Sequence, residues 1–222
     1  MSNYFKKIPN FDYVSRLPDA RISDYITVKN LFKKVKLRDD IFQNLAFFEK
    51  YTIDGDDRPD NVSFKIYDDP IFDWVILLSN NIINIQSEWP LPQRDFDRFV
   101  LDKYGDYDTL YNGIHHYETI EVKNSQGVTI VPEGLNVQDN YTISYYDSFV
   151  NQQIETGNLS NPITNYEYEE ELNNQKRNIF ILKPFYLNVV VNDLDEIMPY
   201  KEGSSQYVSE DLKRGDNIRL YS

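Results

Sequence analysis

The chain has 222 residues, 41% of them apolar and none of them cysteine, so it can bury one large core or two small ones but cannot form disulfides or a thiolate metal site. Its formal net charge of −13 disfavours nucleic acid as a partner, because phosphates repel an acidic surface. No signal peptide and no apolar run of membrane-spanning length is evident, so we expect no membrane association and a protein made in a cytoplasm.

Residues 1–50 are predicted to form an extended N-terminal arm and a connecting segment. This segment alone is basic, with 10 Lys or Arg and 6 Asp or Glu, a net charge of +4. Its cluster of basic side chains is compatible with an acidic partner or with a solvated face. The cluster comprises Lys29, Lys33, Lys34, Lys36 and Arg38.

Several aromatic and apolar residues of the arm have no local sequence partner to pack against. Aromatic side chains supply large contact area at protein interfaces. We therefore interpret these residues as interface candidates, with burial inside the subunit as the alternative, and we add a tryptophan held in a proline corner. The candidates are Tyr4, Phe5, Ile8, Pro9, Phe11, Tyr13 and Trp89.

The segment 51–90 is predicted to hold a strand followed by two short helices. The β-forming residues 51–53 end at an Asp-Gly turn signal. Asp57 is expected to cap a first helix that opens at Arg58 or Pro59, because proline is tolerated where its missing N–H has no partner.

A second helix is predicted to follow Asp69 and Pro70, which repeat the capping pattern. Its apolar residues cover nearly the whole circumference, so we expect a buried helix with Ile71 and Trp74 in the core. Asn80, followed by another asparagine, is a suitable end because asparagine tolerates the left-handed conformation.

Residues 91–205 are predicted to form an α+β lobe. The lobe starts with a helix that stops near Gly105. Alternating β-forming residues on both sides of an Asn-Ser-Gln-Gly turn then predict a β-hairpin near residues 116–137.

The C-terminal third alternates helices and strands. Thr164 and Glu167 have capping-box spacing at the start of a helix. A buried strand at residues 178–182 and a helix that opens at Pro184 follow. Residues 206–222 are predicted to hold a closing strand.

No motif for catalysis, cofactor binding or metal binding is convincing. His115 and His116 are adjacent, so on a strand they would point to opposite faces and could not share a metal. Asp54, Asp56 and Asp57 begin like a calcium loop but lack its glycine and its closing glutamate. We therefore expect a protein that is not an enzyme and that uses no cofactor, metal or small-molecule substrate.

The stretch YTIDGDDRPDNVSFKIYDDPIFDWVILLSNN, residues 51–81, resembles the strand, helix, helix part of a LysM module. More specifically, it resembles the LysM-like part of the small baseplate wedge proteins of T-even-type contractile-tailed bacteriophages. Residues 4–9 and 176–198 are similar to that family as well. The motif residues are Tyr51, Ile53, Gly55, Asp56, Arg58, Pro59, Ile66, Tyr67, Pro70, Trp74, Leu78 and Asn80.

This resemblance implies a structural component of the virion tail baseplate that is assembled in the host cytoplasm. It would clamp other baseplate wedge proteins and, in multiple copies, help to join wedges into a ring. The implied fold is α+β, with a LysM-like β-α-α-β unit, an α+β lobe and an extended N-terminal arm.

One LysM feature is missing from residues 82–92, which lack the strand that ordinarily follows the second helix. A matching pattern occurs at residues 212–220. We therefore expect a split module in which the C-terminal strand pairs with residues 51–53.

Two other functions are compatible with the sequence. The first is a LysM-type protein that binds peptidoglycan or another carbohydrate, although the export signal, repeated modules and linkers usual for such proteins are missing. The second is a scaffold or adaptor unrelated to phage, which the aromatic content of 15% alone would permit.

Overall fold

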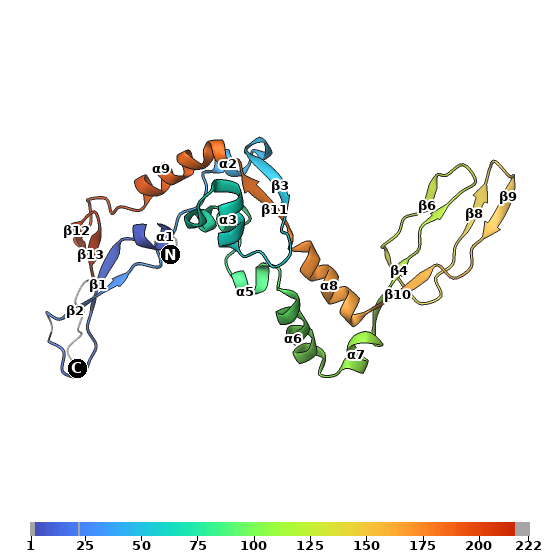
Figure 1. The fold of residues 1–222 in the computed structure, drawn as a ribbon, viewed down its shortest axis with the longest axis horizontal. Coiled ribbons are helices and arrows are strands. Elements are labelled where there is room, and N and C mark those ends of the chain that lie inside the picture. The colour runs from blue at the N-terminus through green and yellow to red at the C-terminus, as the bar shows by residue number, and fades with distance from the viewer. Residues whose placement is uncertain (1–2, 22, 216–222) are drawn as a thin grey trace. The chain divides into compact units, whose positions relative to one another are not determined.

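In the computed structural model, which describes residues 3–21 and 23–215, the chain forms two compact units. Unit 1 contains the described residues up to Trp89 and from Asn178 onward, and unit 2 contains Pro90–Arg177. Unit 2 is therefore an insertion, entered and left through two crossings of the chain (Figure 1). Helices and strands occur in both units, so the fold class is α+β, as predicted.

Unit 1 contains an antiparallel pair of strands, β3 (Phe48–Thr52) and β11 (Asn178–Leu182). Three of the five residues of β11 are buried, and they contribute to both apolar clusters of the unit. The predicted closure by the C-terminal strand is wrong for the described residues, because β13 (Leu212–Arg214) pairs in another sheet. The apolar β11 can fill two cores, whereas β13 carries two basic side chains. Residues 216–220 of the predicted strand lie outside the described residues.

Residues 3–21 and 23–50 form helices, turns and strands and do not form the predicted extended arm. β1 (Asn10–Val14) lies between β2 (Tyr25–Lys29) and β13 in a four-stranded sheet that β12 (Tyr207–Ser209) completes. The short helices of this segment are α1 (Asn3–Lys7), α2 (Asp39–Phe42) and η1 (Leu45–Phe47). The segment also supplies core residues, which explains why it folds back: Ile8, Val35, Leu37 and Ile41.

Two short helices follow β3, as predicted: α3 (Pro59–Tyr67) and α4 (Asp73–Ser79), joined by the 3-10 turn η2 (Pro70–Phe72). Each proline lies in a first turn, where the missing N–H costs no hydrogen bond. A third helix, α5 (Ile85–Glu88), precedes the first crossing into unit 2.

The caps of these helices agree with the sequence in one case and differ in the other. Asp69 caps η2, because its carboxylate accepts the N–H of Ile71 at 2.9 Å. Asp57 is not a cap: its carboxylate forms an ion pair with Lys65, and Arg58 occupies the N-cap position of α3 without a side-chain hydrogen bond.

Asn80 connects the end of α4 to β11 through its side-chain amide. Nδ2 donates to the carbonyls of Ile76 and Phe180, each at 2.8 Å, and Oδ1 accepts the N–H of Phe180 at 2.7 Å. The amide thus pairs with both backbone groups of Phe180, as a neighbouring strand would. We call this arrangement an asparagine clasp. It provides hydrogen-bond partners for Phe180 on the edge of β11 that does not face β3.

Residues 178–205 belong to unit 1, although the sequence placed them in a lobe spanning residues 91–205. The pairing of β11 with β3 brings them there. The turn η3 (Pro184–Tyr186) and helix α9 (Leu187–Ile197) continue in unit 1, and α9 buries Leu187, Val190 and Leu194 in its core.

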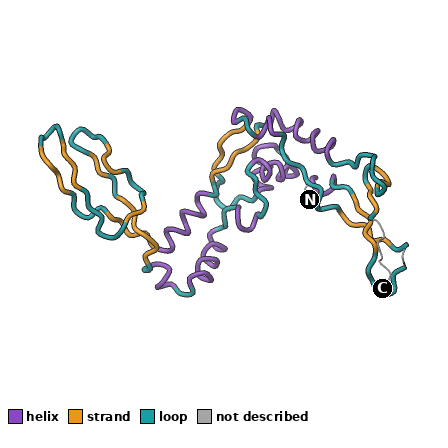
Figure 2. Tube along the Cα trace, turned by 180° about the vertical axis from the view of Figure 1, so that it is seen from behind, coloured by secondary structure: helices purple, strands orange, loops and turns teal. Residues whose placement is uncertain are grey.

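Unit 2 begins and ends with helices that lie side by side (Figure 2). They are α6 (Gln93–Tyr104), α7 (Tyr107–Tyr111) and α8 (Asn165–Gln175). Phe96, Val100 and Leu110 form their small core. The start of α8 is the predicted capping box, in which Thr164 and Glu167 each accept the backbone N–H of the other.

A second asparagine clasp holds the two ends of unit 2 together. The N–H of Leu91 donates to Oδ1 of Asn173 at 2.8 Å, and Nδ2 of Asn173 donates to the carbonyl of Leu91 at 3.1 Å. Asn173 lies near the end of α8 and is buried. The backbone just after the first crossing is therefore paired with the helix that precedes the second.

The rest of unit 2 consists of antiparallel strands (Figure 2). β4 (Ile114–Thr119) lies between β10 (Ser160–Thr164) and β7 (Asn136–Val137). Two further strand pairs are β5 (Val122–Lys123) with β6 (Thr129–Val131), and β8 (Ser144–Asp147) with β9 (Gln152–Glu155). The β4–β7 and β5–β6 pairs form a hairpin over the range where the sequence predicts one.

Asp147 joins the tips of two of these strand pairs. It is only 2% exposed, and its Oδ2 accepts both the N–H and the hydroxyl of Ser125, at 3.0 and 2.7 Å. Its Oδ1 accepts the N–H of Phe149 at 3.0 Å. These hydrogen bonds, that of the Ser125 N–H foremost, lower the pKa of Asp147 below its ordinary value. The charged carboxylate therefore holds the two tips together.

Replacing Asn80 with alanine should lower the free energy of unfolding by about 1–3 kcal/mol, because both backbone groups of Phe180 lose their partner. Asn80→Asp keeps an acceptor oxygen for the Phe180 N–H but sets a carboxylate oxygen against the carbonyls of Ile76 and Phe180, so it should destabilise the protein as well. Chemical denaturation with urea should therefore place both variants below the wild type. Equal midpoints for all three proteins would show that the clasp is not a structural contact.

Asp147→Asn should lower the melting temperature at neutral pH, because an amide is a weaker acceptor for the Ser125 donors than a carboxylate. The folded-state pKa of Asp147 is depressed, so its stabilisation is present above the unfolded pKa of about 4 and is lost as the pH falls through the lower folded pKa. The difference between variant and wild type should therefore shrink in acid.

The control for that experiment is Glu133→Gln, which neutralises an exposed acid on the same strand-rich part of unit 2. Its melting curve should follow that of the wild type from neutral to acidic pH. A difference for Asp147→Asn that stayed constant with pH would contradict the role given to the charge.

Candidate interaction surfaces

Two of the predicted interface residues are exposed. Phe5 and Tyr13 leave 56% and 45% of their surface open to solvent. Tyr4 and Phe11 are half-buried, and the Tyr4 ring lies 5.7 Å from that of Trp74. The contact role of these four aromatic residues stays a prediction, but Phe5 and Tyr13 are placed where a partner could reach them.

The other three candidates are buried within unit 1. Ile8 and Trp89 expose 2% and 5% of their surface, and Pro9 is buried too. Trp89 also donates its indole N–H to the carbonyl of Asp57 at 2.9 Å. Burial inside the subunit, the alternative interpretation, therefore describes these three positions.

Most residues of the LysM-like motif support the fold of unit 1. The buried ones are Ile53, Pro59 and Trp74, and the half-buried ones are Tyr51, Ile66, Tyr67, Leu78 and Asn80. Gly55, at φ 52°, makes the turn after β3, while Asp56, Arg58 and Pro70 are exposed. Tyr67 shows the connection between motif and core, since its hydroxyl donates to the carbonyl of Leu182 at 2.7 Å and its burial raises its pKa.

A shallow depression of about 450 Å³ lies at the first turns of α3 and η2. Pro59, Pro70, Ile85 and Trp89 line it. Ile71, which the sequence placed in the core, is 36% exposed and lines the same depression. The residue sits in the 3-10 turn η2 and not in α4, so the helical spacing that predicted its burial does not apply to it.

Unit 1 carries an exposed apolar surface on η1, η3 and the start of α9. Phe185, Leu45 and Val189 expose 84%, 71% and 38% of their surface. The two 3-10 turns are adjacent, because the rings of Phe47 and Tyr186 lie 4.6 Å apart in an edge-to-face contact. We call Leu45, Phe185 and Val189 the η3 patch.

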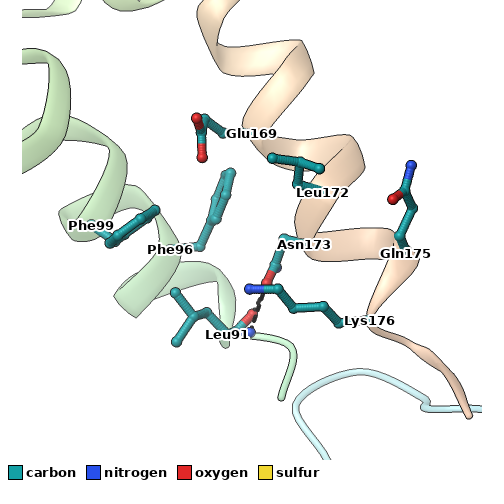
Figure 3. Close-up of a pocket in the computed structure, with 8 residues that line it drawn as sticks. All are labelled: Leu91, Phe96, Phe99, Glu169, Leu172, Asn173, Gln175 and Lys176. Atoms are coloured by element: carbon teal, nitrogen blue, oxygen red, sulfur yellow. Dashed lines mark hydrogen bonds between the residues drawn. The ribbon is translucent and has the colours of Figure 1, made fainter. Parts of the chain in front are cut away.

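Unit 2 carries a groove of about 550 Å³ between α6 and α8 (Figure 3). Its apolar side chains come from both helices and from the segment before α6, and two of them, Phe99 and Leu172, remain 47% and 36% exposed. The groove residues are Leu91, Phe96, Phe99, Glu169, Leu172, Asn173, Gln175 and Lys176.

The acid of this groove is neutralised within unit 2. Glu169 is 5% exposed and accepts hydrogen bonds from Nζ of Lys103 at 2.6 Å and from the Tyr104 hydroxyl at 3.0 Å. The bond to Glu169 raises the pKa of Lys103, and burial, followed by Glu169, raises that of Tyr104. Lys176 forms no ion pair with any described carboxylate, so the groove presents an apolar wall with one available cation.

A third exposed surface flanks the junction that Asp147 makes between two strand pairs. We call Val128, Tyr146, Phe149 and Val150 the tip patch. Their exposed fractions of 55%, 61%, 70% and 47% are high for apolar and aromatic side chains, and such contiguous exposure marks interaction surfaces.

The histidines are arranged differently from the expectation. Nδ1 of His115 lies 2.9 Å from Nδ1 of His116, and the His115 ring stacks on that of Tyr168 at 3.8 Å, so the two rings meet and do not point apart. No group of three or more His, Asp or Glu side chains in the described residues could hold a metal ion. None of the described helices has both the length and the apolar character needed to span a membrane.

Sequence reasoning missed the exposed apolar residues outside the N-terminal segment. Phe99 belongs to a helix that was correctly predicted, but its spacing of three residues from Phe96 does not show that Phe96 is buried and Phe99 exposed. Phe185 follows the helix-opening Pro184 and precedes Tyr186, and the sequence gave no indication of which of the two rings would face solvent. The only sequence signal for such exposure was that the apolar residues cover more of the helix surface than one buried face requires.

Comparison with known proteins gives one result. No curated protein matches the chain. The sequence model of the family described as base plate wedge protein 53 matches residues 4–197, which include all of unit 2 and most of the described part of unit 1. The match gives no support to a carbohydrate-binding LysM protein. The chain belongs to the phage base plate wedge protein 53 family and is a structural protein of the virion baseplate.

Proposed function

We propose that this protein clamps neighbouring wedge proteins in the baseplate of a contractile, T-even-type tail and, in multiple copies, helps to join wedges into a ring. It assembles in the host cytoplasm and has no catalytic role. Its LysM-like unit consists of β3, α3, α4 and β11, the order β-α-α-β, with β11 in place of the C-terminal strand.

The observation that carries this proposal is that each of the two units has its own core and its own exposed apolar surface. Unit 1 presents the η3 patch, and unit 2 presents the groove and the tip patch. A protein with separate surfaces on separately packed units can bind two neighbours at once, which is the minimum requirement for a clamp.

The composition of the surfaces supports protein partners. Aromatic and other large apolar side chains, exposed on a chain with 15% aromatic residues, supply the contact area typical of protein interfaces. The family match extends over both units, so the insertion belongs to the family architecture and is not peculiar to this chain.

Variants that alter one surface at a time should separate the two contacts. Phe99→Ser with Leu172→Ser removes the exposed apolar wall of the groove, and Phe185→Ser removes the centre of the η3 patch. Each tagged variant, supplied to a phage whose own copy is inactivated, should lose one set of co-purifying baseplate proteins about tenfold and keep the other, as loss of an interface anchor does.

The matched control is Asp97→Asn, on the α6 face opposite Phe99, which keeps an oxygen acceptor for Gln93. It should recover the wild-type set of baseplate proteins and restore plaque formation. The clamp proposal would be refuted if the wild-type protein recovered no baseplate protein, or if both surface variants recovered the full set.

A further inference from the structure

Among the described residues, β2 is an edge strand with no neighbouring strand on its outer side. The order of the sheet is β12-β13-β1-β2, so β2 has β1 as its single partner among the described strands. Edge strands present unpaired N–H and C=O groups that can pair with another chain, and proteins usually protect them with proline, a bulge or charged side chains. β2 has the sequence YITVK, with one charged residue at its end and a regular register along its whole length.

The register shows which backbone groups point outward. At one end of the pair the N–H of Asn30 donates to the carbonyl of Pro9, and at the other the N–H of Ser15 donates to the carbonyl of Asp24, both at 2.9 Å. In an antiparallel pair, hydrogen-bonded residues recur at every second position. Between these two bonds, Val28 and Ile26 are therefore the β2 residues whose N–H and C=O groups point to β1.

The alternate residues Tyr25, Thr27 and Lys29 therefore direct their N–H and C=O groups away from β1, although the Lys29 carbonyl already accepts the N–H of Leu31 at 3.0 Å. Thr27 is the middle one of the three. Its N–H has no acceptor within the described residues, because β1 lies on the opposite side of the strand.

One face of this edge is apolar and exposed. Tyr13 pairs with Ile26 and Phe11 pairs with Val28, so the four side chains lie on the same face. Tyr13, Ile26 and Val28 expose 45%, 46% and 44% of their surface. An added strand would cover these side chains as well as the backbone edge.

The other face holds the strands in a fixed register. The carboxylate of the buried Asp12 accepts the Thr27 hydroxyl at 2.7 Å and Nη2 of Arg214 at 3.2 Å. The Arg214 guanidinium also lies 4.8 Å from the centre of the Tyr25 ring. The edge is thus pre-organised before a partner arrives, which lowers the entropic cost of binding.

The end of β2 and the segment that follows it carry positive charge in a chain whose net charge is −13. Nζ of Lys29 donates to the carbonyl of Ile8 and Nζ of Lys33 to that of Pro199, each at 2.7 Å. In the described part of the chain, no carboxylate lies within ion-pair distance of Lys29, Lys33 or Lys34. Burial lowers the pKa of Lys33, and the positive charge of Lys213 lowers it further. Contacts to neutral carbonyls leave this positive charge uncompensated.

Resting on the clamp function, we infer that the outer edge of β2 receives an extended segment of a neighbouring wedge protein. The segment adds a fifth strand to the sheet through the backbone groups of Tyr25, Thr27 and Lys29. Its inward side chains are apolar, to cover Ile26 and Val28, and acidic residues flank them to meet the lysines that follow β2. This is strand addition at a sheet edge, in which backbone hydrogen bonds supply affinity and alternate side chains supply specificity.

Thr27→Pro tests the inference directly. Proline removes the outward N–H and leaves the bonds between β2 and β1 in place, because those belong to the alternate residues. Thr27→Val is the matched control: it also loses the hydroxyl that binds Asp12, yet it keeps the N–H. Circular dichroism melting of both variants establishes that the sheet is folded.

In phage that lack their own copy, incorporation of Thr27→Pro into purified wedges should fall about tenfold, while Thr27→Val should incorporate as the wild type does. Deuterium exchange of peptides covering residues 25–29 should slow when the wild-type protein is assembled into wedges. Incorporation should also weaken with added salt, because acidic and basic groups meet.

The outcomes separate this inference from the clamp function. Normal incorporation of Thr27→Pro, or unchanged exchange of residues 25–29 in assembled wedges, overturns the strand addition and leaves the clamp intact. Failure of the wild-type protein to enter wedges overturns the clamp itself. Concentration-dependent protection of the same residues in the isolated protein would identify a second copy as the occupant and overturn the assignment to another wedge protein.

Discussion

The fold of unit 1 depends on the pairing of β3 with β11. Thr52 lies opposite Asn178 in this pair, so the entire insertion must be made before the strands can meet. Loop-closure entropy grows only with the logarithm of loop length, which is why so long an insertion is tolerated. Once β11 is in place, it completes two apolar clusters at the same time. Both clusters are therefore complete only when the two strands have paired.

Features encoded by neighbouring residues were predictable from the sequence. The Asp69-Pro70 helix start and the capping box of Thr164 and Glu167 are short-range hydrogen-bond patterns, and both occur where the residues indicate them. The cap at Asp57 failed because Lys65, eight residues further on, provides a stronger partner for the same carboxylate. A capping pattern predicts the structure only where no charged side chain competes for the capping group.

The strand that closes unit 1 was not predictable in the same way. Residues 178–182 and 212–220 both have the β-forming character that the missing strand requires, and pairing depends on which of them can be buried. Ile179 and Ile181 fill a core, whereas Arg214 requires the carboxylate of Asp12. Strand identity can be read from single residues, but the choice of partner is a property of the packed unit.

The candidate surfaces show the same division. Aromatic and apolar composition indicated interfaces, but not which side chains would be exposed: Ile8 and Trp89 are buried, while Phe5 is exposed to solvent. A candidate side chain is buried where the fold places residues from distant parts of the chain around it. Trp89, for example, packs in the same apolar cluster as Ile179 and Ile181, and the carbonyl of Asp57 accepts its indole N–H.

The two asparagine clasps fix the chain on both sides of the insertion. On the unit 1 side, Asn80 pairs with Phe180, close to the point where the chain returns. On the unit 2 side, Asn173 pairs with Leu91, close to the point where the chain enters. Each unit thus fixes its own chain ends by amide-to-backbone bonds, which hold position better than apolar contacts because hydrogen bonds are directional. The backbone that follows each of the two crossings, Leu91 in unit 2 and Phe180 in unit 1, is therefore already paired within its own unit.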